Sequence, residues 1–208
     1  MKQKFKTTGS PDLFKNKFLN VLTRTNIAVP LTIFYTSSSI VLLYYILYKQ
    51  IHISTLLINF FLGILFFTLI EYFVHRVVFH IKGDGEAIQK FQYIVHGVHH
   101  EYPKDKLRLA MPPIVSVFLS LILLSFFNFV LGYYGLPFGS GFIFGYALYL
   151  SIHYSVHAFS PPNNFLKKLW HHHALHHYQD GETAFGVSSP IWDYIFRTMP
   201  RKKIKKAV

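Results

Sequence analysis

The chain lacks cysteine and has few charged residues for its length. None of its 208 residues is Cys, which excludes disulfides, thiolate zinc sites and iron–sulfur clusters. Only 14% of the residues are charged, whereas soluble domains carry about a quarter. Acidic residues are the scarcest, with 9 Asp and Glu against 21 Lys and Arg. Long apolar runs account for the low charge, so we predict that lipid is the solvent for much of the chain.

The net charge of +12 does not indicate a nucleic-acid partner. The basic residues lie in short stretches that flank apolar runs, a pattern typical of topology signals and of contact with anionic lipid headgroups. A DNA-binding protein would gather them on one face. We therefore predict no nucleic-acid partner. The segment 1–26 is polar and basic for longer than a typical signal peptide, and we interpret it as a cytoplasmic N-terminal segment.

Four apolar runs have the length of membrane-spanning helices. They cover approximately 27–48, 53–74, 114–134 and 138–159. Each holds roughly 18–22 residues, which is what a hydrocarbon core of about 30 Å requires. The connectors 49–52 and 135–137 are very short. The runs therefore pair into two helical hairpins.

Lysine and arginine are concentrated on one side of these hairpins. The N-terminal segment has six, 81–113 has five and the tail after Phe159 has eight, whereas the two connectors together have only Lys49. The positive-inside rule places the three basic segments in the cytoplasm. We therefore predict an all-α integral membrane domain over 27–208, with four transmembrane helices and a cytoplasmic helical cap formed by 75–113 and 160–208.

Twelve of the thirteen histidines lie on the predicted cytoplasmic side, and His52 alone lies on the other. They form four clusters: His75 and His80; His96, His99 and His100; His153 and His157; and His171–His173 with His176 and His177. On a helix, residues three and four apart share a face, so each of the last three clusters can aim two or three imidazoles at one point. The spacing of five between His75 and His80 fits a helical face poorly. We expect a bend or a helix end between them.

Pooled, the clusters give ten candidate metal ligands, enough for two ions with about five nitrogens each. The ten are His75, His80, His96, His99, His100, His153, His157, His173, His176 and His177. Imidazole suits iron, copper and zinc, and a redox metal is required to activate dioxygen. Candidates for orienting the ligands are Glu71, Tyr154, His172, Tyr178 and Asp180.

Two alternatives to an enzyme are an adventitious metal-binding tract and a membrane protein that binds or transports metal. The run His171–His177 by itself is typical of an adventitious metal-binding tract. A metal transporter or metal-binding membrane protein would carry polar residues near the middle of its spans, and these spans are almost free of them. Four clusters at helical spacing on one side of the membrane favour a catalytic metal site.

The clusters and their surroundings resemble the fatty acid hydroxylase superfamily, and within it the fatty acid 2-hydroxylases that act on sphingolipid acyl chains. The resemblance covers about 71–198. Its motifs are Glu71-Tyr72-x-x-His75-Arg76-x-x-Phe79-His80, His96-Gly97-x-His99-His100-x-x-Pro103-x-Asp105-Lys106-x-Arg108-Leu109-x-x-Pro112-Pro113, His153-Tyr154-x-x-His157, and His173-x-x-His176-His177-Tyr178 followed by Phe185-Gly186-Val187-x-Ser189-x-x-Trp192-Asp193. The block after His100 distinguishes the acyl 2-hydroxylases from their sterol desaturase relatives.

The resemblance implies that the ten histidines hold two iron ions, with zinc able to occupy the same sites in purified protein. It implies O2-dependent hydroxylation of a lipid acyl chain at the carbon next to the carbonyl. Many family members fuse a cytochrome-b domain, whereas 26 polar residues precede the first apolar run here. We therefore expect a separate cytochrome or ferredoxin-type electron donor. The alternatives within the superfamily are a sterol desaturase-like enzyme or a carotenoid hydroxylase. The chain departs from the family pattern at Leu150, which is usually Asp, and at Ala158, which is usually His.

The predicted position of the metals, just outside the hydrocarbon region, favours an acyl substrate. The lipid headgroup would stay at the basic interface, where Lys104, Lys106 and Arg108 are candidates to meet it. The compact chain favours a bacterial inner membrane. The endoplasmic reticulum is the alternative, because the terminal Lys205-Lys206-Ala207-Val208 resembles a dilysine retrieval signal.

Overall fold

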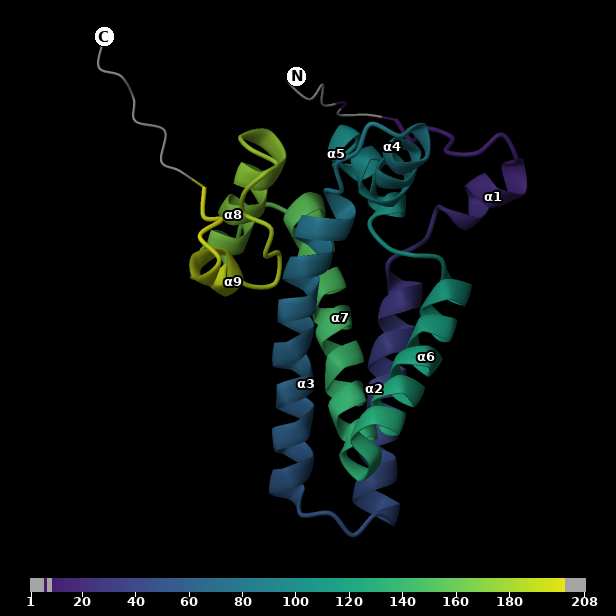
Figure 1. Ribbon diagram of the computed structural model, residues 1–208, viewed down its shortest axis with the longest axis vertical. Coiled ribbons are helices and arrows are strands. Elements are labelled where there is room, and N and C mark those ends of the chain that lie inside the picture. Colours follow the sequence, from purple (N-terminus) through teal and green to yellow (C-terminus); the bar gives the residue numbers. More distant parts are fainter. Residues whose placement is uncertain (1–5, 7–8, 201–208) are drawn as a thin grey trace.

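The computed structural model describes residue 6 and residues 9–200, and within them every regular element is helical. Four long helices run side by side (Figure 1): α2 (Ala28–Tyr48), α3 (Ile53–Phe73), α6 (Pro113–Leu131) and α7 (Gly135–Ala158). The prediction of an all-α fold is confirmed for the described part of the chain. The C-terminal dilysine resemblance lies outside the described residues.

Three stretches are long and apolar enough to cross a membrane: Ala28–Tyr48, Ile53–Phe79 and Lys106–Ala158. The third contains both α6 and α7, so the three stretches account for all four long helices. Their outer faces carry large apolar side chains, among which Phe129 is 88% exposed and Leu47 is 67% exposed. Such faces are stable in lipid and unstable in water.

The turn between α6 and α7 differs from the prediction. We expected the connector at 135–137, but α7 already begins at Gly135 and the turn is the 3-10 segment η4 (Gly132–Tyr134). Gly132 adopts φ 55°, a conformation that L side chains rarely adopt. The chain therefore reverses at Gly132. The connector between α2 and α3 lies at 49–52, as predicted.

Helix α7 is the centre of the bundle and packs against α2, α3 and α6. Glycines allow its close approach to α3. A Cβ at Gly141 would overlap the backbone carbonyl of Phe60, and a Cβ at Gly63 would overlap that of Phe138. Small residues of this kind let helix backbones touch where the surrounding lipid gives no hydrophobic drive for association.

Replacing Gly141 with alanine is expected to destabilise the bundle, because the backbones of α3 and α7 must move apart. Overpacking costs about 1–3 kcal/mol. The higher helix propensity of alanine, about 1 kcal/mol, opposes this loss. The thermal midpoint of the detergent-solubilised protein should fall by several degrees. Gly85→Ala is the matched control, since its Cβ would lie 3.9 Å from the side chain of Ile88, an ordinary van der Waals contact. Equal midpoints for the two variants would contradict close α3–α7 packing.

The shorter helices α1, α4, α5, α8 and α9 lie at one end of the bundle (Figure 1). They are α1 (Lys17–Leu22), α4 (Glu86–Gln92), α5 (Val98–Glu101), α8 (Lys167–Tyr178) and α9 (Ile191–Ile195), with the π-helical turns η1 (Val74–Phe79) and η2 (Tyr93–Gly97) and the 3-10 turn η3 (Lys106–Arg108). The clustered histidines lie on these elements, at His80 directly after η1, and at the end of α7.

The π-helical turn η1 explains the spacing of His75 and His80. In a π-helix the hydrogen bonds join residues five apart, so side chains at that spacing point to the same side. The helix ends at Phe79, with His80 as its C-cap, which agrees with the predicted helix end. The common direction of the two imidazoles nevertheless comes from the π-helical turn rather than from a bend.

Candidate metal centre

The ten predicted ligands lie in two groups of five. The first group is His75, His80, His96, His100 and His176, and the second group is His99, His153, His157, His173 and His177. Within each group, one ring nitrogen of every imidazole lies within 4.8 Å of the other four. Stacked rings of His100 and His177, with centroids 4.2 Å apart, bring the two groups into contact.

Helix geometry divides two of the four sequence clusters between the two groups. On α8, His173 and His177 belong to the second group and His176 belongs to the first. Around α5, His96 and His100 belong together and His99 does not. Each residue turns a helix by about 100°, so the residues three and four places on diverge to opposite sides of the starting direction. One short helix can thus serve two neighbouring sites.

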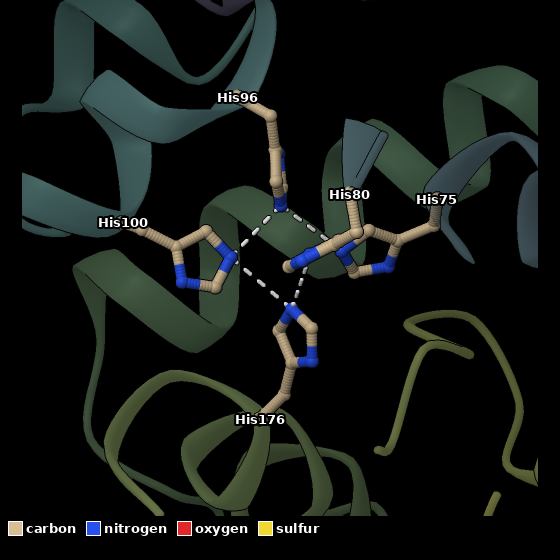
Figure 2. A group of neighbouring side chains, drawn as sticks. All are labelled: His75, His80, His96, His100 and His176. Atoms are coloured by element: carbon tan, nitrogen blue, oxygen red, sulfur yellow. Dashed lines mark hydrogen bonds between the residues drawn. The ribbon is translucent and has the colours of Figure 1, made fainter. Parts of the chain in front are cut away.

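The imidazoles of the first group converge on a common space (Figure 2). The Nε2 atom of His96 lies 2.9 Å from Nε2 of His100 and 3.1 Å from Nε2 of His75. The Nε2 atom of His176 lies 3.1 Å from Nε2 of both His80 and His100. All five residues therefore present the same ring nitrogen to the centre.

Two backbone carbonyls fix the tautomers in the first group. Nδ1 of His75 lies 2.5 Å from the oxygen of Phe185, and Nδ1 of His176 lies 2.7 Å from the oxygen of Thr183. A carbonyl can only accept, so each Nδ1 carries the hydrogen and each Nε2 presents a lone pair. This is the arrangement that metal-bound histidines adopt.

The second group converges in the same way. Nε2 of His153 lies 3.0 Å from Nε2 of His99, and Nε2 of His157 lies 2.8 Å from Nε2 of His173. Both ring nitrogens of His177 are buried without a hydrogen-bond partner among the described residues. An unpaired buried polar atom costs about 1–3 kcal/mol, and a metal ion at the centre of the group would remove that cost at Nε2. The donor set therefore fits a transition metal.

Four ligand imidazoles outside the apolar stretches, those of His80, His99, His173 and His176, are neutral at pH 7. Burial, together with the charge of Lys82, lowers the pKa of His80 to about 4. Burial, together with the neighbouring His80, lowers the pKa of His176 to about 3. Burial and neighbouring imidazoles likewise hold the pKa values of His99 and His173 well below the ordinary value. Neutral rings keep the lone pairs that metal binding requires.

Asp193 is a buried residue that our assignment of roles from the sequence missed. It is 0% exposed, and its carboxylate accepts hydrogen bonds from the N–H groups of Phe185 (2.9 Å) and Gly186 (2.8 Å) and from the hydroxyl of Thr198 (2.7 Å). Nε2 of His172 lies 2.9 Å from the same carboxylate. The signal in the sequence was an acidic residue inside a motif of the resemblance.

The predicted orienting residues lie in different surroundings. Glu71 accepts hydrogen bonds from the N–H groups of Val187 (2.7 Å) and Ser188 (2.9 Å), next to the loop that contacts the first group. His172 contacts Asp193. The remaining three are Tyr154, whose ring packs near Phe159, Tyr178, whose ring lies 5.9 Å from that of His177, and Asp180, which accepts from the N–H of Glu182.

Two cavities reach the histidines. The first cavity has a volume of about 420 Å³, and its wall is partly polar and partly apolar. Its lining includes Lys104, Lys106, Trp170, Tyr178, His157 and His177. The second cavity, about 360 Å³, is mainly apolar and has Met111, Tyr146, Tyr149 and Leu150 in its wall. It touches His96 of the first group and His99 and His153 of the second group.

Arg108, a headgroup candidate, already has protein partners. Its side chain is 4% exposed and lies 3.5 Å from the carboxylate of Asp105. It donates to the hydroxyls of Thr23 (2.9 Å) and Ser10 (3.4 Å) and to the carbonyl of Pro11. A headgroup would have to displace these contacts, whereas Lys104 and Lys106 are exposed at the first cavity.

The model of the fatty acid hydroxylase family matches residues 60–198, which include all ten histidines. The chain belongs to the fatty acid hydroxylase family. This hydroxylase-family chain is 35% identical over 144 residues to the dihydroceramide fatty acyl 2-hydroxylase FAH1 of Arabidopsis thaliana, covering 68% of this chain and 60% of the relative. It is 34% identical over 145 residues to a fatty acid 2-hydroxylase of Rattus norvegicus, covering 67% of this chain and 39% of the relative.

A solved structure, full-length scs7p with only the hydroxylase domain visible, is similar to the hydroxylase-family chain with a TM-score of 0.76 and 32% identity. The match covers 90% of this chain and 71% of that one. The ceramide very long chain fatty acid hydroxylase scs7 of Schizosaccharomyces pombe is 34% identical over 93% of this chain and 56% of its own length. The chain thus spans less than two thirds of the length of these three curated relatives.

Proposed function

We propose that the chain hydroxylates a lipid acyl chain at the carbon next to the carbonyl. One observation carries the proposal: the mainly apolar second cavity ends on histidines of both groups. A hydrocarbon chain in that cavity would meet the metals without crossing water. The relatives named as fatty acid or ceramide hydroxylases support the same chemistry.

The overall reaction balances when dioxygen and an external reductant are supplied. One C–H bond, O2, two electrons and two protons give one C–OH group and one water. We propose that a separate cytochrome or ferredoxin-type protein supplies the electrons. The two metal ions, which we propose to be iron, supply when bound the redox chemistry that activates dioxygen.

The residues of the chain hold and orient the reactants. The ten histidines would hold the two ions, and the carbonyls of Thr183 and Phe185 keep the Nε2 lone pairs of His176 and His75 directed at the centre. The second cavity would bind the acyl chain and exclude water from the reacting carbon. Lys104 and Lys106 would meet a polar headgroup at the first cavity, and Tyr154, Tyr178 and Asp180 remain predictions as orienting residues.

We propose that α2, α3, α6 and α7 cross the membrane as two hairpins within a single domain, 27–208, that follows the segment 1–26. The clustered lysines and arginines support a cytoplasmic position for the cap, 75–113 and 160–208. Location in a bacterial inner membrane, rather than in the endoplasmic reticulum, stays a prediction. Fractionation of the source cells would check it.

Lipid mass spectrometry of a host that expresses the chain under ¹⁸O2 tests the function. The wild type is expected to add one ¹⁸O atom to acyl chains, and tandem spectra should place it on the carbon beside the carbonyl. The double variant His176→Ala, His177→Ala should add none, because each group loses a ligand. His52→Ala is the matched control, since His52 lies at the opposite end of the bundle, and it should retain the product.

The other outcomes would overturn the proposal in different ways. Label on a sterol or a carotenoid would identify the alternative enzymes of the same superfamily. No label on any lipid, with metal bound and an electron donor supplied, would favour a membrane metal-binding or transport protein.

A further inference from the structure

The two histidine groups differ in how their outer nitrogens are supported. In the first group, Nδ1 of His75 and Nδ1 of His176 each bond a backbone carbonyl, whereas Nδ1 of His100 is buried without a partner among the described residues. In the second group, four Nδ1 atoms are buried without a partner in the part of the chain that the structure describes. They belong to His99, His153, His173 and His177. Partners of this kind raise metal affinity by about 10–100-fold, so the first group has the stronger support.

Both supporting carbonyls come from the loop 183–187, which has a strained backbone. Ala184 adopts φ 58° and is fully buried. The left-handed region costs a residue with a Cβ about 1–2 kcal/mol. The N–H of Ala184 donates to the oxygen of Thr198 at 2.9 Å, and Glu71 accepts from Val187. The strain persists because these contacts over-determine the loop.

Asp193 holds this loop in place through hydrogen bonds to its backbone. Its carboxylate accepts from the N–H groups of Phe185 and Gly186, on either side of the carbonyl that contacts His75. The same carboxylate contacts His172 of α8, the helix that carries His176. A fully buried carboxylate is costly unless it is paired, and here it has protein partners on both oxygens. Asp193 therefore joins the loop to α8.

We propose that Asp193 is a positioning residue for the first histidine group alone, and that the ion of this group is consequently retained when the ion of the second group is lost. The inference rests on the metal centre of the proposed function. The first cavity opens onto His157 and His177 and gives a chelator access to the second group. The first group is supported by the loop that Asp193 holds, and the second group is open to a chelator. We therefore expect the two ions to leave at different rates.

Chelator-driven loss of zinc from the detergent-purified full chain tests the proposal. The protein is loaded with two Zn²⁺ per chain and challenged with EDTA, and bound zinc is measured over time by elemental mass spectrometry. The wild type is expected to lose one ion at least about tenfold faster than the other. Asp193→Asn should accelerate the slow phase by about 10–100-fold and leave the fast phase unchanged.

Three further variants assign the phases and control for folding. His99→Ala should weaken the fast ion and leave the slow ion in place. Asp84→Asn is the matched control, because Asp84 is an exposed carboxylate in the segment between η1 and α4, to which no role at the metal centre is assigned. It should reproduce the wild-type curve. His172→Asn removes one partner of Asp193 and should accelerate the slow phase by a smaller factor, which keeps a test available if Asp193→Asn does not fold.

Three results would overturn the proposal. They are a single phase for both wild-type ions, equal acceleration of both phases by Asp193→Asn, and no change of the slow phase in His172→Asn when Asp193→Asn does not fold. Each is read from metal content, so a failure here is separate from a failure to hydroxylate lipid. Lipid analysis of the same preparations would show which of the two had failed.

Discussion

Replacing His96 and His100 together with alanine is expected to leave one metal ion per chain and to reduce hydroxylation to background. Both side chains belong to the first group, which would keep three of its five nitrogens, while the second group stays complete. Three imidazoles without their neighbours hold a divalent ion far more weakly than five. His173→Ala with His177→Ala should remove the other ion and give the same count. Elemental analysis after dialysis and lipid mass spectrometry measure the two effects.

The matched control removes the same number of histidines from a single sequence cluster. His99 and His100 are neighbours in the chain but lie in different groups, so His99→Ala with His100→Ala leaves each group with four nitrogens. This variant should still bind two ions, each more weakly than in the wild type. If it instead bound one ion while His96→Ala with His100→Ala bound two, the division into two groups would be wrong.

Filling the second cavity is expected to abolish product while both ions stay bound. Ala110 lines this cavity of about 360 Å³, and Ala110→Phe would add a phenyl ring at its wall. An acyl chain displaced by an ångström from the reacting position loses about 100-fold in rate. Lipid mass spectrometry should therefore show a fall of about 100-fold or more, with zinc content unchanged at two per chain.

Two other alanine-to-phenylalanine variants are controls for Ala110→Phe. Ala87 is exposed on α4, and Ala87→Phe should retain the wild-type yield. Ala158 lines the first cavity. A loss of product in Ala158→Phe with none in Ala110→Phe would place the acyl chain in the first cavity and contradict the role given to the second.

The four long helices could be predicted from the sequence because each helix must by itself be long and apolar enough to cross the hydrocarbon core of a bilayer. The predicted runs 27–48 and 53–74 agree with α2 and α3 within one residue. The connector was misplaced because Gly132 and Gly135 lie three residues apart, and only the packing of Gly135 against the backbone of Phe127 decides which one turns. A local sequence pattern cannot distinguish a glycine at a chain reversal from a glycine that packs against another helix.

The candidate ligands could likewise be found from the sequence, because imidazoles at helical spacing share a face whatever surrounds them. The sequence by itself determined the all-helical class, the apolar helices and the ten histidines that gather. The tertiary structure alone decided which histidines share a group, that η1 is π-helical, that Arg108 is occupied by protein partners, and that Asp193 holds the loop behind His75. His75 and Phe185 are 110 residues apart, and His80 and His176 are 96 apart. Contacts at such separations depend on how α3, α7 and α8 pack, and periodicity along the chain carries no information about that packing.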